Sequence, residues 1–444
     1  MKYTPYHSFP LVQLLIALPI CCMICSTQNS AQPNIPQQTN KPALVKQVKN
    51  TDPITYDWPH WRGPHRNGIS PETGWLGKMP EIKQVWHASI GTGFSSIAVS
   101  QGRLYTMGNT AKSRRDKNQQ DVVYCLNAKT GQLIWKQAYP CELQANSYEG
   151  GPHATPTVEN DRVYTCSKMA QVFCFDKARG EVIWSTDLQK DFGFKPPNWG
   201  FATSPTIIEN KILLNVGSAA VALDKADGKI IWQSQKEGAG YATPLPFASG
   251  GMKGVAFIAA KHFVLIDHET GKELWRIPWE TSFDISGADP VFSGDYVFIS
   301  SGYNTGGALY KLSSGTGSQI WKSQTLRTQC NSSVLWQGHL YGFDGNMVGS
   351  VDRGGSLKCI EYKTGVEKWS AGGLGVGSLM LADSKIIVLS EAGELLIVGA
   401  DPQGFNVLTR AQILQGKCWT MPVLSGGLIY ARNAVGDLVC VDAK

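Results

Sequence analysis

The ten residues Leu126–Trp135, with the sequence LNAKTGQLIW, recur in degenerate form along most of the chain. In each copy a glycine stands four residues before a tryptophan. A repeat of fixed period indicates one supersecondary unit used many times, so it is the first guide to the fold. The glycine and tryptophan pairs are Gly131 and Trp135, Gly180 and Trp184, Gly228 and Trp232, Gly271 and Trp275, Gly317 and Trp321, and Gly365 and Trp369.

A single copy, taken over residues 154–186, predicts four short antiparallel strands. Runs rich in Val, Ile, Thr, Tyr, Phe and Trp alternate with turn residues such as Asn160 and Asp161. The glycine is expected in the hairpin turn before the fourth strand, where a positive φ suits a residue without a side chain. The tryptophan is expected to be a packing residue that fills the gap between two neighbouring sheets.

The spacing of the copies predicts the architecture. Successive tryptophans from Trp86 to Trp369 lie 43 to 49 residues apart, and a four-stranded repeat of about 40–50 residues is typical of a propeller blade. A degenerate copy follows, in which Gly404 precedes Leu408 by four residues. A second count agrees: eight segments of the sequence each read as an inner strand followed by a second strand. The repeat and this count together predict an all-β, eight-bladed propeller of four-stranded antiparallel blades. Seven blades remain the alternative if the copy at Gly404 is incomplete.

The two ends of the repeat region predict how the ring closes. Residues Leu438–Lys444 begin the motif but lack its glycine and tryptophan. Residues Glu81–Ser89 supply a tryptophan strand with nothing before it. We therefore expect the N-terminal strand to complete the C-terminal blade, which removes the exposed sheet edges that favour aggregation.

The N-terminal residues resemble an export signal. Lys2, the apolar run Leu11–Cys25 and the small residues before position 32 predict a signal peptide over residues 1–31. The run is short for a membrane span, so no transmembrane domain is expected after cleavage. Residues 32–57 are predicted to be a disordered tether. Residues 58–444 are predicted to form the propeller, with a structured preamble over 58–80 and blades over 81–444.

Cysteine usage indicates packing. Four cysteines occupy the same position in the predicted third strands and are expected to be small buried residues: Cys125, Cys174, Cys359 and Cys440. A disulfide between Cys330 and Cys418 is left open. Lipid attachment at Cys21, Cys22 or Cys25 is also open, but plain secretion is favoured because the residues before them are not small. No pattern of metal ligands occurs, so no metal site is predicted.

The loops that lead into the inner strands are the expected binding region, because they meet at one mouth of the channel. Aromatic rings with a few polar groups are typical of a concave site, although loops that meet at a channel are also aromatic for packing reasons alone. His153 is expected to be structural, the distance between Glu149 and Asp284 is open, and no catalytic residue is assigned. The candidates are Tyr148, Glu149, His153, Asn198, Trp199, Phe201, Tyr241, Asp284, Arg327 and Trp419.

The motif [LI]-[DN]-x-x-T-G-x-x-x-W, seen best at Leu126–Trp135 and Ile266–Trp275, resembles the tryptophan docking motif of the pyrroloquinoline-quinone-like repeat family. The resemblance extends from about Trp86 to the C-terminus. It implies two alternatives: quinoprotein dehydrogenases that use pyrroloquinoline quinone (PQQ) and calcium, and non-enzymatic propellers similar to BamB, an outer-membrane assembly scaffold.

Two departures from the dehydrogenase pattern favour the scaffold. The only adjacent cysteine pair, Cys21-Cys22, lies in the signal region, and the chain has no room for long substrate loops. Some soluble dehydrogenases also lack the cysteine pair, so its absence leaves the alternative open. We expect an exported, periplasmic or secreted monomer that binds a protein or cell-envelope partner without a cofactor. The mild net charge of +6 argues against a nucleic-acid partner. The alternative is a PQQ- and calcium-dependent alcohol or sugar dehydrogenase.

Overall fold

The computed structural model describes residues 56–217, 220–234, 238–249, 252–313, 316–347 and 354–444. The predicted signal peptide, the lipid-attachment question and most of the predicted tether lie outside these residues. The described chain is all-β apart from helix α1 (Leu188–Phe192) and the 3₁₀ turn η1 (Ser282–Asp284). No described helix has the length and apolar character needed to span a membrane.

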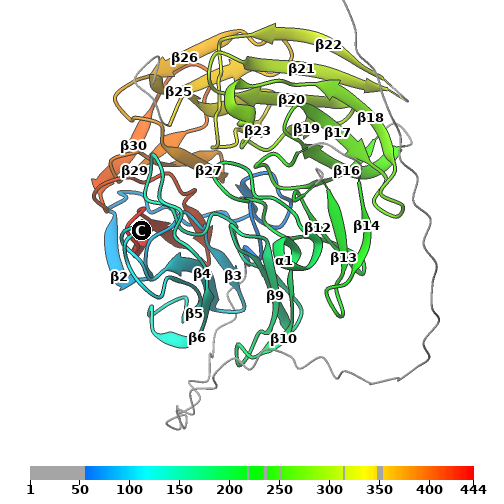
Figure 1. Cartoon of the computed structure of the whole chain (residues 1–444). Coiled ribbons are helices and arrows are strands. Elements are labelled where there is room, and N and C mark those ends of the chain that lie inside the picture. The colour runs from blue at the N-terminus through cyan, green and yellow to red at the C-terminus, as the bar shows by residue number, and fades with distance from the viewer. Residues whose placement is uncertain (1–55, 218–219, 235–237, 250–251, 314–315, 348–353) are drawn as a thin grey trace, which may run out of the picture. The chain divides into compact units, whose positions relative to one another are not determined.

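Eight four-stranded antiparallel sheets surround a channel, as predicted (Figure 1). Blades 1 to 4 follow one another along the chain, each from its inner to its outer strand. Blade 1 holds β3 (Ala98–Ser100), β4 (Arg103–Asn109), β5 (Gln120–Asn127) and β6 (Leu133–Pro140). Blade 2 holds β7 (Thr157–Glu159), β8 (Arg162–Cys166), β9 (Gln171–Asp176) and β10 (Val182–Asp187). Blade 3 holds β11 (Thr206–Ile208), β12 (Lys211–Leu214), β13 (Val221–Asp224) and β14 (Ile230–Gln233). Blade 4 holds β15 (Leu245–Ser249), β16 (Met252–Ile258), β17 (His262–Ile266) and β18 (Glu273–Pro278).

Blades 5 to 8 complete the ring, and the copy at Gly404 is a full blade. Blade 5 holds β19 (Val291–Ser293), β20 (Tyr296–Ser301), β21 (Gly306–Ser313) and β22 (Thr316–Ser323). Blade 6 holds β23 (Val334–Trp336), β24 (His339–Gly345), β25 (Gly354–Glu361) and β26 (Glu367–Ala371). Blade 7 holds β27 (Ser378–Ala382), β28 (Lys385–Leu389), β29 (Glu394–Gly399) and β30 (Val407–Gln412), with β1 (Ile69–Ser70) added in parallel to β27. Blade 8 holds β31 (Val423–Ser425), β32 (Leu428–Arg432), β33 (Asp437–Asp442) and β2 (Lys83–Ser89).

Blade 8 confirms the predicted closure. Strand β2 pairs antiparallel with β33, and Trp86 lies opposite Cys440. The outer strand of the last blade therefore comes from the start of the propeller, and backbone hydrogen bonds join the two ends of the ring. This pairing satisfies the edge that β33 would otherwise expose.

The repeated tryptophans join neighbouring blades. Trp135 of blade 1 donates its indole N–H to the carbonyl of Lys177 in blade 2 at 3.0 Å. Its ring also covers Gly180, where an added Cβ would lie 2.5 Å from the ring carbons. Gly180 has a φ of +74°, so both space and backbone conformation require glycine there. The same indole-to-carbonyl bond is made by Trp86, Trp184, Trp232, Trp321 and Trp369.

Blade 5 departs from the expected hairpin turn. Gly317 does not have the positive φ of its counterparts, because the pairing of β21 with β22 continues to Ser313 and Thr316 and places Gly317 within the strand. An added Cβ at Gly317 would meet Ile277 rather than a tryptophan ring. The buried indole N–H of Trp275 has no hydrogen-bond partner. The prediction of a left-handed turn was therefore wrong for this copy.

The third-strand cysteines are buried free thiols, as predicted. Each is opposed on one side by a tyrosine and on the other by a repeat tryptophan; Cys125, for example, lies between Tyr105 and Trp135. A small side chain leaves room for the two large rings. Cys330 and Cys418 are also free thiols, so the disulfide left open by the sequence does not form.

The preamble runs across the channel. It contacts the inner-strand region of blades on both sides of the ring, and Glu72 fastens it to blade 8 by accepting from the N–H groups of Gly426 and Gly427 at 3.0 and 2.8 Å. Its other contacts are Trp58 with Val99, Pro59 with Val158, Arg62 with Ser333 and Gly68 with Leu381. Tyr56 and Asp57, at the end of the predicted tether, are also bonded, to Ser425 and Ser100.

Candidate binding site at the channel mouth

The loops before the inner strands enclose a cavity of about 200 Å³. Its lining combines aromatic rings with hydroxyl and amide groups, which is the usual chemistry of a small-molecule or side-chain pocket. Half of the ten residues proposed from the sequence line it. These are Tyr148, His153, Trp199, Tyr241 and Trp419.

The other five candidates lie outside this lining. Phe201 is 1% exposed and belongs to the hydrophobic core between blades 2 and 3. Glu149 forms an ion pair with Lys417 at 2.8 Å, and Arg327 forms one with Asp344 at 2.9 Å. The last two are Asn198, which lines a separate polar cavity between blades 1 and 2, and Asp284, which lies in η1.

Aromatic pairs form the wall of the cavity. The rings of Phe94 and Trp419 are stacked with centroids 5.4 Å apart, and Trp199 meets Tyr241 edge to face at 6.2 Å. Phe94 was missed by the sequence analysis, although it lies in the loop before the inner strand of blade 1, as the other wall residues do before theirs. Candidates were sought in the loops that lead into the inner strands, and the same search in the loop before blade 1 would have found Phe94.

Two wall residues are held by a buried network. The ring of His153 lies 5.5 Å from that of Tyr148, and burial lowers the pKa of His153 well below its ordinary value, with Lys168 adding to the effect. The ammonium of Lys168 donates to the Tyr148 hydroxyl at 2.9 Å, and burial lowers the pKa of Lys168 to about 8. His153 is therefore a neutral wall residue at neutral pH.

The floor is formed by Trp61 of the preamble and by Asp289, which comes directly before blade 5. Asp289 is 5% exposed. Its Oδ2 accepts from the Trp61 indole at 2.5 Å and its Oδ1 from the Thr243 N–H at 2.9 Å. Arg62 lies behind it, with Nη1 3.9 Å from Oδ2. Burial raises the pKa of Asp289, and the charge of Arg62 opposes this rise.

Asp289 belongs to a belt of bonds that the sequence analysis did not recognise. Four bonds link the heads of five successive inner strands, and in each a backbone N–H donates to a side-chain oxygen of the next blade. The bonds run from Thr155 to Ser204, from Ser204 to Thr243, from Thr243 to Asp289 and from Asp289 to Ser332. The signal was present in the sequence: a residue with a side-chain oxygen stands before proline at four of these positions, and Asp289-Pro290 occupies the place of Thr243-Pro244.

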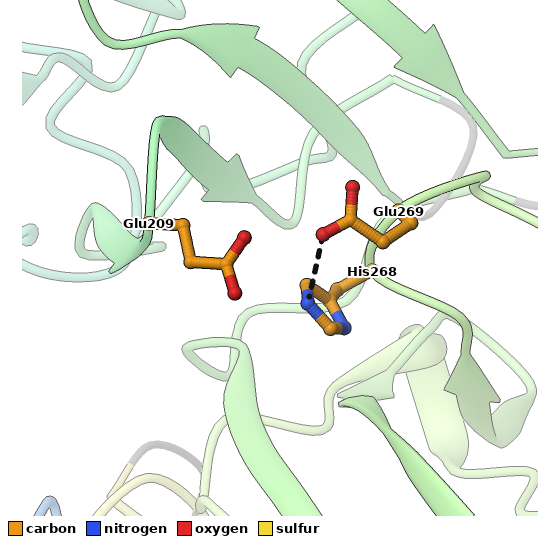
Figure 2. A group of neighbouring side chains, drawn as sticks. All are labelled: Glu209, His268 and Glu269. Carbon is orange, nitrogen blue, oxygen red and sulfur yellow. Dashed lines mark ion pairs between the residues drawn. The ribbon is translucent and has the colours of Figure 1, made fainter.

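A group of possible metal ligands lies elsewhere. Glu209, His268 and Glu269 bring their ligand atoms within 4.8 Å of one another, where the β11–β12 turn of blade 3 meets the turn after β17 in blade 4. Figure 2 shows the Glu209 carboxylate directed toward His268 and Glu269. Glu269 already accepts from Lys211 at 2.6 Å, and both glutamates are exposed. A cation would have to compete with the Lys211 ammonium for the Glu269 carboxylate. The group is therefore a surface cluster of ion pairs.

Comparison with known families identifies the repeat. The sequence profile of a family described as outer membrane protein assembly factor BamB matches residues 119–305 and 259–444. The chain belongs to this PQQ-like repeat family. The match covers most of the ring, and it agrees with the tryptophan docking bonds between blades.

Solved structures share the fold of this PQQ-like propeller at low sequence identity. A quinohemoprotein alcohol dehydrogenase from Comamonas testosteroni superposes with a TM-score of 0.66 and 11% identity, covering 87% of this chain and 80% of that chain. A europium-containing methanol dehydrogenase superposes with a TM-score of 0.65 and 11% identity, covering 86% and 90%. At this identity the likeness shows the propeller architecture alone.

A curated relative matches part of this PQQ-like propeller. It is a tetrathionate hydrolase from Acidithiobacillus ferrooxidans, 25% identical over 255 residues, which are 53% of this chain and 46% of the relative. The matched region thus spans about half the length of that protein.

The lining of the mouth cavity does not suit the calcium ion and quinone of the alternative raised by the sequence. Among the described residues that line it, Asp289 is the one carboxylate, and both of its oxygens already accept hydrogen bonds. Calcium takes six to eight oxygen ligands, usually with several carboxylates. Cys330 is the one described cysteine in the lining, so no adjacent cysteine pair stands over the cavity.

Proposed function

We propose that this protein is an exported, non-enzymatic propeller that holds a protein or cell-envelope partner at the channel mouth. An uncharged ring of the partner, either a sugar ring or an aromatic side chain, would enter the cavity. The observation that carries this proposal is the wall of paired aromatic rings above a floor whose carboxylate is already hydrogen-bonded. Such a surface offers stacking and a few hydrogen bonds to a ring.

The ionisable groups of the cavity support binding rather than acid–base chemistry. A general base works best when its pKa lies near the working pH. Burial lowers the pKa of His153 far below that range and raises the pKa of Cys330 to about 12. Burial also raises the pKa of the Tyr148 phenol. Asp289 is engaged by Trp61 and Thr243. None of these groups is ready to exchange a proton with a substrate at neutral pH.

The partial relationship to a tetrathionate hydrolase supports a weaker alternative. Tetrathionate is a divalent anion, and a site for it would be expected to present arginine or lysine. The described lining of the mouth cavity contains neither residue. The chemistry of the cavity therefore favours an uncharged ring over an anionic substrate.

The proposal is tested by titrating the purified protein with ring ligands while following tryptophan fluorescence. Triacetylchitotriose represents the sugar ring and N-acetyltryptophanamide the aromatic side chain. We expect one of them to bind saturably and to bind about tenfold more weakly to Trp199→Ala, because a stacking partner is lost. Phe192→Ala is the matched control, since Phe192 is an exposed aromatic residue in α1 and does not line the cavity.

A parallel titration with PQQ and calcium addresses the enzymatic alternative. A stoichiometric complex that reduces a dye in the presence of an alcohol or sugar would overturn the proposal. Failure of both ring ligands to bind, or equal weakening in Trp199→Ala and Phe192→Ala, would also count against it.

A further inference from the structure

A second cavity, of about 430 Å³, lies farther along the channel. Residues of the inner strands show its position, because Leu245 and Val291 line it whereas Thr243 and Asp289, two residues earlier in each case, line the mouth. The preamble contributes Trp61 to the mouth cavity and its next residue, Arg62, to the second one. The preamble therefore lies between two cavities of different chemistry.

Two arginines of the preamble line the second cavity, and both have unused donors. Arg66 makes no side-chain hydrogen bond to any described residue, and its buried Nη1 has no partner. Arg62 is 1% exposed. Its Nη2 donates to the carbonyls of Asn67 at 3.0 Å and Ser333 at 2.6 Å, but its Nε has no partner. A buried donor on a charged group is costly to leave unpaired, and a bound anion is one way to satisfy it.

The charges around the second cavity do not balance. Asp289 is the one described acidic group that acts on both Arg62 and Arg66. Burial lowers the pKa of Arg66 to about 10, which leaves its guanidinium charged at neutral pH. Two positive charges thus share one carboxylate, which is itself bonded to Trp61 and Thr243. The surplus positive charge is partly buried, where an anion interacts with it strongly.

The rest of the lining suggests what kind of molecule bears the anionic group. Phe292 and Leu335 form the apolar wall of the lining, and His65, which also lines the cavity, is exposed. Guanidinium groups present a planar fork of donors that matches the oxygens of phosphate, sulfate and carboxylate. A free inorganic ion would use only the arginines, whereas an anion on a short apolar stem would also contact the wall.

We propose that the second cavity is an oxyanion site in which Arg66, supported by Arg62, binds a phosphate, sulfate or carboxylate group borne on an apolar stem. This site is separate from the partner site proposed at the channel mouth. It gives a role to the buried Nη1 of Arg66 and the buried Nε of Arg62, which have no hydrogen-bond partner among the described residues. Its occupant would be a small anionic molecule or an anionic group attached to one.

Calorimetric titration of the purified protein with inorganic phosphate, sulfate, acetate and butyl phosphate tests the proposal. We expect saturable binding, with butyl phosphate bound more tightly than inorganic phosphate because its stem contacts Phe292 and Leu335. Arg66→Gln should weaken binding about tenfold or more, as expected for a lost charge-assisted hydrogen bond. Arg115→Gln removes the same charge from an exposed loop and should bind as the parent does.

Stability measurements separate binding from misfolding. The side chain of Arg66 makes no hydrogen bond to a described residue, so Arg66→Gln should melt at the parent temperature or above it at low salt without anion. Butyl phosphate should raise the Tm of the parent protein but not that of Arg66→Gln, and sodium chloride of equal ionic strength should not reproduce the effect. Equal binding by the two proteins, no binding at millimolar ligand, or an equal response to chloride would overturn the proposal. If inorganic phosphate bound more tightly than butyl phosphate, the proposal that the ligand has an apolar stem would be wrong.

Discussion

At the scale of single residues, five of the contacts between blades place a tryptophan ring against a glycine, as Trp135 lies against Gly180. Gly180 combines a positive φ with contact to Trp135. Gly193, which ends α1, has a similar φ of +70°, but an added Cβ would meet nothing within 4 Å. Comparing these two positions separates the cost of backbone strain from the cost of displacing the indole.

We expect Gly180→Ala to lower the free energy of unfolding by about 3 kcal/mol, because left-handed strain and overpacking add together. Gly193→Ala should cost about 1 kcal/mol, since only the strain remains. Urea unfolding followed by tryptophan fluorescence measures both values. Equal losses in the two variants would show that the contact between Trp135 and Gly180 adds no packing constraint.

Asp121 is a second residue whose environment affects stability, in this case through the pH. It is 1% exposed in β5. Its Oδ1 accepts from the Asn109 amide at 2.8 Å, while Oδ2 is buried without a partner. Burial raises the pKa of Asp121 from 3.8 to about 6, against the effect of the Asn109 hydrogen bond. The folded protein therefore holds a proton here over a pH range in which the unfolded chain has released it.

Stability should consequently fall as the pH rises from about 4 to about 6. The rise in pKa from 3.8 to about 6 corresponds to about 3 kcal/mol. Asp121→Asn should lack this loss, so the parent protein should lose about 3 kcal/mol relative to the variant between pH 4 and pH 7. Urea unfolding of both proteins across this range measures the difference. Parallel pH profiles would contradict the assigned pKa.

At the scale of elements, strand β2 decides whether the ring is closed. Its Trp86 is 8% exposed, donates to the Ala128 carbonyl at 3.0 Å and lies 5.9 Å from the ring of Tyr430. Trp86 is thus held in the last blade by the pairing of β2 with β33, and its indole N–H joins that blade to the first. The neighbouring His87 points outward and makes only a surface contact with Asp437.

Trp86→Ala should lower the free energy of unfolding by about 4 kcal/mol, the usual cost of removing a large buried aromatic side chain. We also expect faster amide exchange in β2 and β33, because the closure between them opens locally before the ring unfolds. Hydrogen exchange followed by mass spectrometry measures this by strand. His87→Ala should retain the parent exchange pattern, and unchanged exchange of β33 in Trp86→Ala would argue against closure by β2.

At the scale of the whole propeller, the preamble divides the channel by chemistry. Trp61 faces the aromatic mouth cavity, while Arg62 and Arg66 line the second one. Asp289 connects the two, because it accepts from Trp61 and lies 3.9 Å from Arg62. The two proposed sites therefore share one buried carboxylate, yet each can be tested by a variant on its own side: Trp199→Ala at the mouth and Arg66→Gln beyond the preamble.

The mouth site was only partly predictable. The loop positions brought Trp199, Tyr241 and Trp419 to one cavity, because every inner strand begins at the same end of the channel. Asp284 was predicted to line the site, but the carboxylate that lines the cavity is that of Asp289. Phe201 is buried in the hydrophobic core. The path of a loop determines which of its residues face inward, and that path depends on contacts with neighbouring blades rather than on local sequence.

The sequence by itself predicted four-stranded blades, their strand order and the closure through Trp86, and it favoured eight blades over seven. Those features rest on local patterns that repeat at a fixed period, and strand alternation, turn residues and docking tryptophans are readable in each copy. Only the tertiary structure decided that the preamble crosses the channel, that Asp289 joins the belt between blades, and that the Arg66 side chain has no hydrogen-bond partner among the described residues. These features arise from contacts between residues far apart in the chain, such as Trp61 with Asp289 and Arg62 with Ser333. Such contacts depend on packing geometry, which no periodic pattern records.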